Sequence, residues 1–244
     1  MKDRIDKFKE ILKSCDNIVF FGGAGVSTES NIPDFRGDKG LYKSKYNGLS
    51  PEEIISHTFF INNNKMFYDY YFENMVYEKA LPNKAHYALT KLEKMGKLKA
   101  IITQNIDNLH QMSGSKNVYE LHGSVFRNYC MKCNKFYSLN DLLERKEKPY
   151  CKCGGLIKPD VVLYEEGLDG KIIDESIEKI LNARVLIVAG TSLTVQPAAS
   201  FIRYFRGNYL IVINKEPTHL DRFATIVFHE NVGDVLDEAV KELW

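Results

Sequence analysis

Long apolar runs are scarce in this chain of 244 residues. Stretches such as Val185–Ala189 are far shorter than the roughly 20 apolar residues of a membrane-spanning helix, so no such helix is predicted. An excess of charge of one sign is also missing, because 33 Lys and Arg stand against 32 Asp and Glu, which leaves a net charge of +1. This balance excludes a broad basic surface for a nucleic acid backbone, and any anion must be bound locally.

The N-terminus lacks the apolar core of a secretory signal. Apolar residues recur there at helical spacing and predict an amphipathic first helix: Ile5, Phe8, Ile11 and Leu12. A disulfide framework is not indicated, because the five cysteines are odd in number and four of them form two close pairs. This pattern fits a metal site in a reducing compartment, and we expect the protein to be cytoplasmic.

Short apolar runs alternate with helical patterns along most of the sequence. Five runs rich in Val, Ile and Phe are predicted to be strands that are apolar on both faces: 18–21, 99–103, 185–189, 210–213 and 225–228. Helical patterns lie between and after them, at about 83–96, 173–182, 197–206 and 232–243. The alternation predicts an α/β fold with a doubly wound, Rossmann-like parallel sheet.

Two stretches interrupt this plan. Residues 37–78 are rich in aromatic side chains and predict a helical insertion beside the sheet. Residues 126–160 contain the paired cysteines and few apolar residues. They therefore predict a small module that has no core of its own and needs a cross-link, such as a bound metal, to hold it together.

The first predicted strand runs into Gly23-Ala24-Gly25, with Ser27 and Thr28 close behind. Glycine lets backbone N–H groups approach a phosphate, and a helix that starts there would point its positive end at the anion. The usual dinucleotide fingerprint is incomplete, since Thr28 stands where its third glycine would fall and no acid follows the strand at about 20 residues. A simple dehydrogenase is therefore disfavoured, and a plain turn remains the alternative.

A second motif, Pro33-Asp34-Phe35-Arg36, follows shortly afterwards. Arg36 supplies a guanidinium for a phosphate, and Phe35 supplies an aromatic ring that can cover a cofactor ring. The alternative for this tetrapeptide is a turn with a surface salt bridge.

Four cysteines form two close pairs, Cys130 with Cys133 and Cys151 with Cys153, separated by 17 residues. Structural zinc is held by four thiolates in this arrangement, and glycines after the second pair let the backbone fold around the sulfurs. All four protein ligands would be used, so the metal would have no open position for catalysis. Four unrelated buried thiols are the alternative, and Cys15 is expected to be an ordinary buried thiol.

Polar residues cluster where the second predicted strand ends, at Gln104, Asn105 and Asp107. Ligands of doubly wound sheets bind at the carboxyl ends of the strands, so this cluster predicts a binding site. His122 comes soon after, beside Gly123, which would let a substrate approach the imidazole. A structural role for this histidine is the alternative.

Two further strands end in small or polar residues, Gly190-Thr191-Ser192 and Asn214-Lys215-Glu216. Both clusters repeat the theme of polar residues at the end of an apolar strand and could line the adenosine half of a dinucleotide. Helix capping at the first cluster and a turn at the second are the alternatives.

These motifs, in this order, make the chain resemble the bacterial-type sirtuins over nearly its whole length. The resemblance rests on Gly-Ala-Gly-Val-Ser at 23–27, Pro-Asp-Phe-Arg at 33–36, Thr-Gln-Asn-Ile-Asp at 103–107, His-Gly at 122–123, the four cysteines, Gly-Thr-Ser-Leu at 190–193 and Ile-Asn at 213–214. It implies an NAD-dependent protein lysine deacetylase with structural Zn²⁺, which transfers the acetyl group of acetyl-lysine to ADP-ribose and releases nicotinamide. It also implies a Rossmann-like domain of residues 1–36, 79–125 and 161–244, and a small domain made of a helical module, 37–78, and a zinc module, 126–160.

The resemblance also implies roles for individual residues. His122 would be the general base, while Asn105 and Asp107 would orient the ribose and the nicotinamide amide. The residues expected to contact NAD are Gly23, Ala24, Gly25, Ser27, Thr28, Asp34, Phe35, Arg36, Gln104, Asn105, Ile106, Asp107, Gly190, Thr191, Ser192, Val195, Asn214, Lys215, Glu216 and Val232. The residues expected to contact an acetylated protein or peptide are Val161, Val162, Tyr164 and Tyr68.

Two departures from the family pattern bear on specificity. Glu165 stands where the family often has glycine, which favours substrates with basic residues near the lysine. Tyr71, three residues after Tyr68, stands where sirtuins that prefer succinyl-lysine carry arginine, so we expect deacetylation and weak desuccinylation. Two rival functions stay open: a zinc-ribbon binding module on a nucleotide-sensing domain without catalysis, and ADP-ribosyl transfer to a protein.

Overall fold

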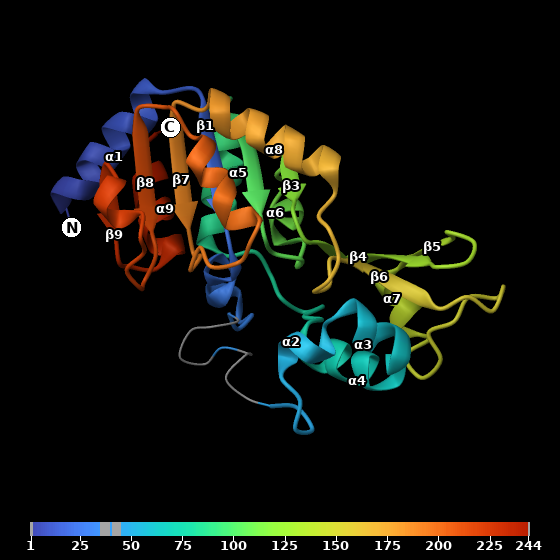
Figure 1. The fold of residues 1–244 in the computed structure, drawn as a ribbon. Helices are drawn as coiled ribbons and strands as arrows, with labels where there is room; N and C mark the ends of the chain where they lie inside the picture. Colours follow the sequence, from blue (N-terminus) through green and yellow to red (C-terminus); the bar gives the residue numbers. More distant parts are fainter. Residues whose placement is uncertain (1, 35–39, 41–44, 244) are drawn as a thin grey trace.

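The computed structural model describes residues 2–34, 40 and 45–243. A large parallel sheet with helices on both faces forms one part of the molecule, and a smaller part of short strands and helices lies beside the lower end of that sheet (Figure 1). The predicted doubly wound α/β fold is therefore confirmed. Within residues 2–34, 40 and 45–243, no helix has both the length and the apolar character needed to cross a bilayer.

The large sheet has six parallel strands in the order β3-β2-β1-β7-β8-β9. Their bounds are β1 Ile18–Gly22, β2 Leu98–Thr103, β3 Val118–Glu120, β7 Val185–Ala189, β8 Tyr209–Ile213 and β9 Ile226–Phe228. Strands β2 and β3 are added on one side of β1, and β7, β8 and β9 are added on its other side. The direction of the strand order therefore reverses between β1 and β7, which are neighbours. Ligands bind at such a switch point, at the carboxyl ends of the strands.

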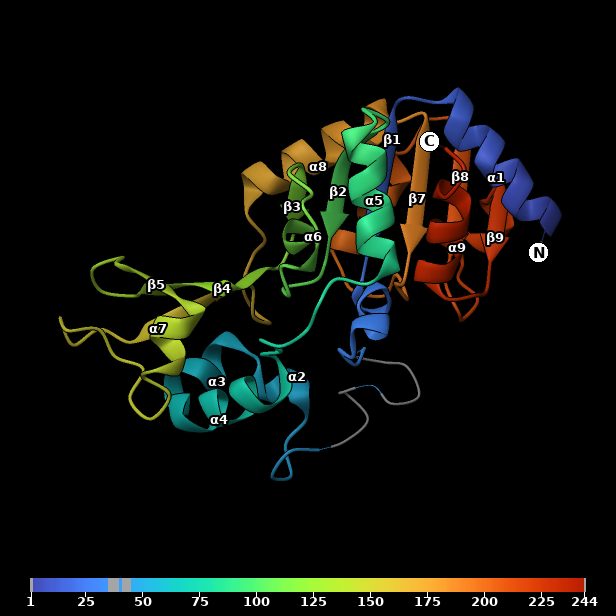
Figure 2. The ribbon, with the colours of Figure 1, turned by 180° about the vertical axis from the view of Figure 1, so that it is seen from behind.

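The two faces of this sheet are covered by different helices (Figures 1 and 2). One face packs against α1 Lys2–Ser14, α5 Lys84–Lys94 and α9 Val232–Val240, and the other against α8 Gly170–Asn182 and η4 Ala198–Tyr204. All five strands predicted from the sequence are present, because strands covered on both faces read as continuous apolar runs. The helical pattern at 197–206 corresponds to η4, which is a 3-10 helix whose three-residue turn suits its buried Ala198 and Phe201, three positions apart.

The smaller part contains an antiparallel sheet in the order β5-β4-β6, with bounds β4 Gly123–Cys130, β5 Phe136–Ser138 and β6 Ile157–Val161. Four short helices complete it: α2 Pro51–Ile54, α3 His57–Asn62, α4 Asn64–Asn74 and α7 Leu139–Leu143. One apolar cluster joins all of them, since Phe67 and Tyr71 of α4 share it with Tyr137, Leu142 and Ile157. The cysteine-rich segment therefore has a core, which it shares with the helical insertion.

Candidate active site

A cleft of about 490 Å³ lies at the carboxyl ends of β1, β2, β7 and β8 and reaches the end of β6. This volume falls in the usual range for small-molecule sites. All the described residues predicted to contact NAD line it: Gly23, Ala24, Gly25, Ser27, Thr28, Asp34, Gln104, Asn105, Ile106, Asp107, Gly190, Thr191, Ser192, Val195, Asn214, Lys215, Glu216 and Val232. His122 and three of the predicted substrate residues, Val161, Val162 and Tyr164, line the same cleft. Phe35 and Arg36 lie outside the described residues.

Glycines bring the loops after β1 and β7 into direct backbone contact. The N–H of Gly25 donates to the carbonyl of Gly190 at 2.8 Å, and Gly190 has a φ of 58°, in the left-handed region. A Cβ on Gly25 would lie 2.7 Å from Cα of Gly190, so no larger residue fits without moving a loop. The segment after β1 forms two 3-10 turns, η1 Ala24–Val26 and η2 Thr28–Ser30, and not the longer helix that the phosphate argument assumed.

A hydrogen-bonded network fixes the polar residues after β2. Ser27 donates its hydroxyl to Oδ2 of Asp107 at 2.6 Å, and Asn105 donates Nδ2 to Oγ of Ser27 at 3.0 Å. Oδ1 of Asp107 accepts the backbone N–H of Leu109 at 3.0 Å. Burial raises the pKa of Asp107, and these hydrogen bonds oppose that rise. The network holds side chains from the β1 and β2 loops in one arrangement at the base of the cleft.

His122 lies where the chain leaves β3 for β4. Its Nδ1 is 2.9 Å from the carbonyl oxygen of Gln104, which can only accept, so Nδ1 carries the proton in the neutral ring and Nε2 keeps its lone pair. Burial lowers the pKa of His122 below that of a free histidine, an effect that the bond to Gln104 opposes. A neutral imidazole with one free basic nitrogen is the form that a general base requires.

The segment after β6 forms backbone hydrogen bonds with the His122 turn on one side and with the helical insertion on the other. The N–H of Val162 donates to the carbonyl of His122 at 3.0 Å, and the N–H of Tyr164 donates to the carbonyl of Ile55 at 3.0 Å. The N–H of His57 in turn donates to the carbonyl of Tyr164 at 3.0 Å. This segment therefore connects the His122 turn to the start of α3.

The four paired cysteines converge, as the sequence predicts. Their sulfurs all lie within 4.8 Å of one another, with Cys130 and Cys153 at 3.5 Å and Cys133 and Cys151 at 3.6 Å. Four thiolates at 2.3 Å from one zinc ion would stand about 3.8 Å apart in a tetrahedron, so the cluster fits that metal. Cys15 lies elsewhere: it directly follows α1 and is buried in the core of the large sheet with 1% of its surface exposed, as expected.

Comparison with known proteins identifies the family. The model of the Sir2 family matches residues 23–197, more than half of the chain. This chain belongs to the Sir2 family. A Clostridium tetani protein named NAD-dependent protein deacetylase is 58% identical over 244 residues, which cover 99% of each chain. A Clostridium acetobutylicum protein of the same name is 56% identical over 241 residues and 98% of each chain.

Solved Sir2 structures share the whole architecture. A Sir2 homologue in complex with NAD is 38% identical, with a TM-score of 0.87 over 98% of this chain and 93% of that one. A Sir2 complex with a p53 peptide and NAD⁺ is 36% identical, with a TM-score of 0.87 over 98% of both chains. The resemblance to sirtuins drawn from the motifs is thus confirmed.

In this Sir2 chain the predicted substrate residue Tyr68 lies apart from the other three. Tyr68 is only 2% exposed and is not among the described residues that line the cleft, because its ring stacks on Phe72 and its hydroxyl donates to the carbonyl of Ile157. Tyr71 is fully buried against Phe67. The insertion instead lines the cleft with residues that the sequence analysis missed: Ile55, Asn74, Met75 and Tyr77.

Glu165 also differs from expectation. It adopts a φ of 74°, the left-handed conformation that favours glycine, and its Oε2 accepts the backbone N–H of Thr58 at 2.8 Å. Its hydrogen bonds with Thr58 lower the pKa of this carboxyl. The charge is therefore bound to the start of α3 as well as facing the cleft, which weakens the argument that Glu165 selects basic substrate residues.

Proposed function

We propose that this chain is an NAD-dependent protein lysine deacetylase, which transfers the acetyl group of acetyl-lysine to ADP-ribose and releases nicotinamide. The observation that carries the proposal is the position of a neutral His122 in the same cleft as the glycine loops and the Ser27–Asp107–Asn105 network. The name of the relatives at 56–58% identity supports the same activity. A binding module without catalysis would have no use for an oriented base of this kind.

The chain's own residues divide the work by their place in the cleft. Bound NAD would supply the ADP-ribose that accepts the acetyl group and the nicotinamide that leaves. The loops at 23–28 and 190–192 would bind its phosphates through backbone N–H groups, which glycine lets approach closely. The residues at 214–216 and Val232 would bind the adenosine half, together with Val195. Asn105 and Asp107 would orient the nicotinamide riboside, because their network is already formed.

Proton transfer is assigned to His122. Its Nε2 would take a proton from a hydroxyl brought within hydrogen-bonding reach, while the carbonyl of Gln104 holds the ring by Nδ1. Val161, Val162 and Tyr164 would bind the peptide as an added strand, in which main-chain hydrogen bonds supply affinity with little sequence preference.

Zinc would be held by Cys130, Cys133, Cys151 and Cys153 in a closed tetrahedral site. Such a site stabilises the fold and leaves no position for a substrate. The proposed zinc is therefore structural.

Acetyl-lysine is the acyl-lysine that the cleft suits best. The insertion and β4 supply apolar groups to the lining, Ile55, Met75, Val125 and Phe126. Among the described lining residues, the only Lys or Arg is Lys215, which follows β8 with the residues assigned to adenosine. A succinyl carboxylate would be desolvated there without a cation, at a cost of several kcal/mol.

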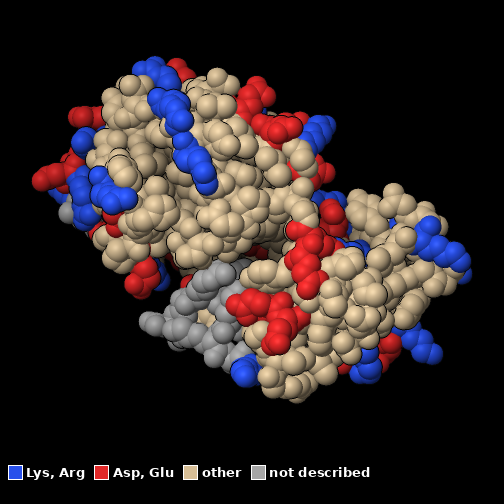
Figure 3. Space-filling model, viewed as in Figure 1, with Lys and Arg blue, Asp and Glu red and all other residues tan. Residues whose placement is uncertain are grey.

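The proposed setting is the cytoplasm, with an acetylated protein as partner and no nucleic acid. None of the five cysteines, all of which lie in the described part of the chain, forms a disulfide, as is usual in a reducing compartment. On the face drawn in Figure 3, basic and acidic side chains are interspersed and the basic ones form no continuous field. Nucleic acid binding needs such a field.

Nicotinamide release from NAD tests the proposal directly. The purified protein is incubated with NAD and an acetylated peptide, and nicotinamide, free peptide and acetyl-ADP-ribose are measured by mass spectrometry. We expect all three to form in equal amounts, and neither nicotinamide nor acetyl-ADP-ribose to form with the unacetylated peptide. His122→Ala should lower the steady-state rate of product formation by about 100-fold or more, whereas His219→Ala, which changes an exposed histidine outside the cleft, should not. Binding of NAD without any of these products would favour the non-catalytic rival, and ADP-ribose attached to protein would favour the transferase.

A further inference from the structure

The turn that carries His122 is also the junction between the two sheets. Glu120 is the last residue of β3 in the large sheet, and Gly123 is the first residue of β4 in the small one. Gly123 has a φ of 74°, and a Cβ there would collide with the carbonyl oxygen of Asp160 on β6. The direction in which β4 leaves the large sheet therefore decides where His122 lies.

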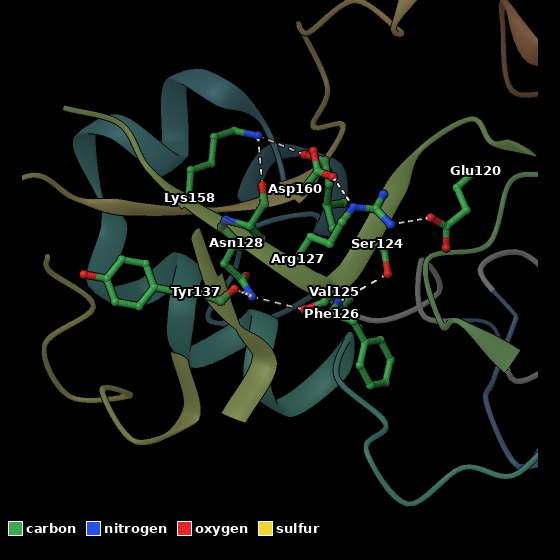
Figure 4. A network of polar contacts seen from close by, with 11 residues as sticks. Glu120, Ser124, Val125, Phe126, Arg127, Asn128, Tyr137, Lys158 and Asp160 are labelled. Carbon is green, nitrogen blue, oxygen red and sulfur yellow. Dashed lines mark hydrogen bonds and ion pairs between the residues drawn. The ribbon is translucent and has the colours of Figure 1, made fainter. Parts of the chain in front are cut away.

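One side chain spans this junction. Arg127, on β4, donates Nη1 to Oε2 of Glu120 at 2.6 Å and Nε to Oδ2 of Asp160 at 2.7 Å (Figure 4). Its guanidinium thus bonds carboxylates from the large sheet and from the small sheet at once. A planar fork with fixed donors holds two carboxylates at a defined angle, which a lysine would not do.

The pairing with Glu120 is an obligatory one. The Glu120 side chain is 7% exposed, and its Oε1 has no hydrogen-bond partner within the described part of the chain. A carboxylate this far out of water needs the Arg127 charge, because removal of one partner from a buried pair leaves an uncompensated charge. Glu120 is also coupled to the site through its neighbour, since the N–H of Leu121 donates to the carbonyl of Thr103 at 2.9 Å.

We propose that Arg127 is a positioning residue for His122: it holds Glu120 and Asp160 together and so fixes the angle of the turn on which the imidazole lies. This inference rests on the proposed function, because it concerns the base of that reaction. Arg127 does not line the cleft and acts only through the turn.

The test is a double-mutant cycle between Arg127→Met and His122→Ala. Arg127→Met alone should lower kcat by about 10- to 100-fold, since small misplacement of a reacting group costs that much, while the KM for NAD stays within about twofold. In the His122→Ala background the same change should leave the residual rate within about twofold, because there is no imidazole left to misplace. Arg203→Met, an exposed arginine on η4, is the matched control and should keep full activity.

Two results would overturn the inference: an equal loss of kcat in both backgrounds, or an unchanged kcat in Arg127→Met. Should Arg127→Met fail to fold, Arg127→Lys and the double variant Glu120→Gln/Arg127→Met, which buries no unpaired charge, take its place with the same expectations. Circular dichroism and NAD-induced thermal shift report folding and cofactor binding in each variant. Absence of any peptide-dependent nicotinamide release from the unmodified protein would refute the proposed function itself, which distinguishes the two failures.

Discussion

Acid should destabilise this protein through a pair of histidines buried behind the cleft. His86 on α5 and His110 on α6 Leu109–Met112 are 0% and 1% exposed, with ring centroids 4.7 Å apart. Nδ1 of His86 accepts the backbone N–H of Asn83 at 3.2 Å, which is possible only while that nitrogen is unprotonated. Burial lowers the pKa of His86 to about 4, and burial with the nearby His86 lowers that of His110.

The size and sign of the effect follow from linkage. In the unfolded chain His86 is protonated near the ordinary histidine pKa of about 6.5, whereas in the folded protein its pKa is about 4. Between these two pH values the unfolded state therefore binds more protons than the folded state. The stabilisation is present above pH 6.5 and is lost as the pH falls toward 4. From pH 7 to pH 5 the loss due to His86 alone is about 2 kcal/mol in the free energy of unfolding.

Urea unfolding at pH 7, 6 and 5 measures this loss. His86→Gln keeps a side-chain oxygen that can accept the Asn83 N–H but does not titrate, so its stability should fall by about 2 kcal/mol less than that of the unmodified protein over the same range. The exposed His219→Gln is the control and should follow the unmodified protein. Because His110 lies three residues after Asp107, activity should fall with stability. Equal losses in the unmodified protein and His86→Gln would refute the reasoning.

Three further predictions concern the reaction and the metal. His122→Ala should lower kcat by about 100-fold or more while NAD binding is retained. Because burial lowers the pKa of His122, the activity of the unmodified enzyme should fall on acidification with a midpoint below pH 6.5. A midpoint above pH 6.5 would contradict this. Cys130→Ala should lose zinc and cooperative unfolding, as metal analysis and thermal melts would detect, whereas Cys15→Ala should keep the metal; full activity without zinc would contradict the structural site. On one peptide, kcat/KM for succinyl-lysine should be well below that for acetyl-lysine. A ratio of one or more would contradict the expectation that no cation of the described lining neutralises a succinyl carboxylate.

The large sheet could be predicted because its strands are buried on both faces, and such strands stand out as apolar runs. The strand β3 was missed because it is three residues long and only partly buried. Strands β4, β5 and β6 were not predicted for a different reason. The apolar residues of this segment pack against an insertion about 70 residues earlier, so neither segment alone shows a complete core. Local periodicity cannot reveal a core that two distant segments share.

The part of the cleft that the large sheet forms could be predicted from the motifs, since most of them follow a strand and parallel strands bring their ends to one edge. Tyr68 was named from the family resemblance alone, in an insertion that has no motif to anchor the comparison. In the structure α4 turns Tyr68 to β6, and the last residue of this helix, Asn74, lines the cleft together with Met75 and Tyr77. The link from Glu120 through Arg127 to Asp160 joins residues up to 40 positions apart and carries no motif. Only the fold brings them together.

The shared core also connects the four-cysteine cluster to the side of the cleft that Ile55 and Met75 line. Cys130 and Cys151 belong to the same apolar cluster as Ile55 and Met75, and those two residues line the cleft. Loss of the metal would free the cysteine-rich strands from this cluster, and α2 to α4 would lose the surface on which they pack. Zinc bound by the four cysteines would therefore support the proposed substrate site without touching the cleft. We expect metal removal to raise the KM for the acetylated peptide before it weakens NAD binding, which would depend mainly on the loops of the large sheet.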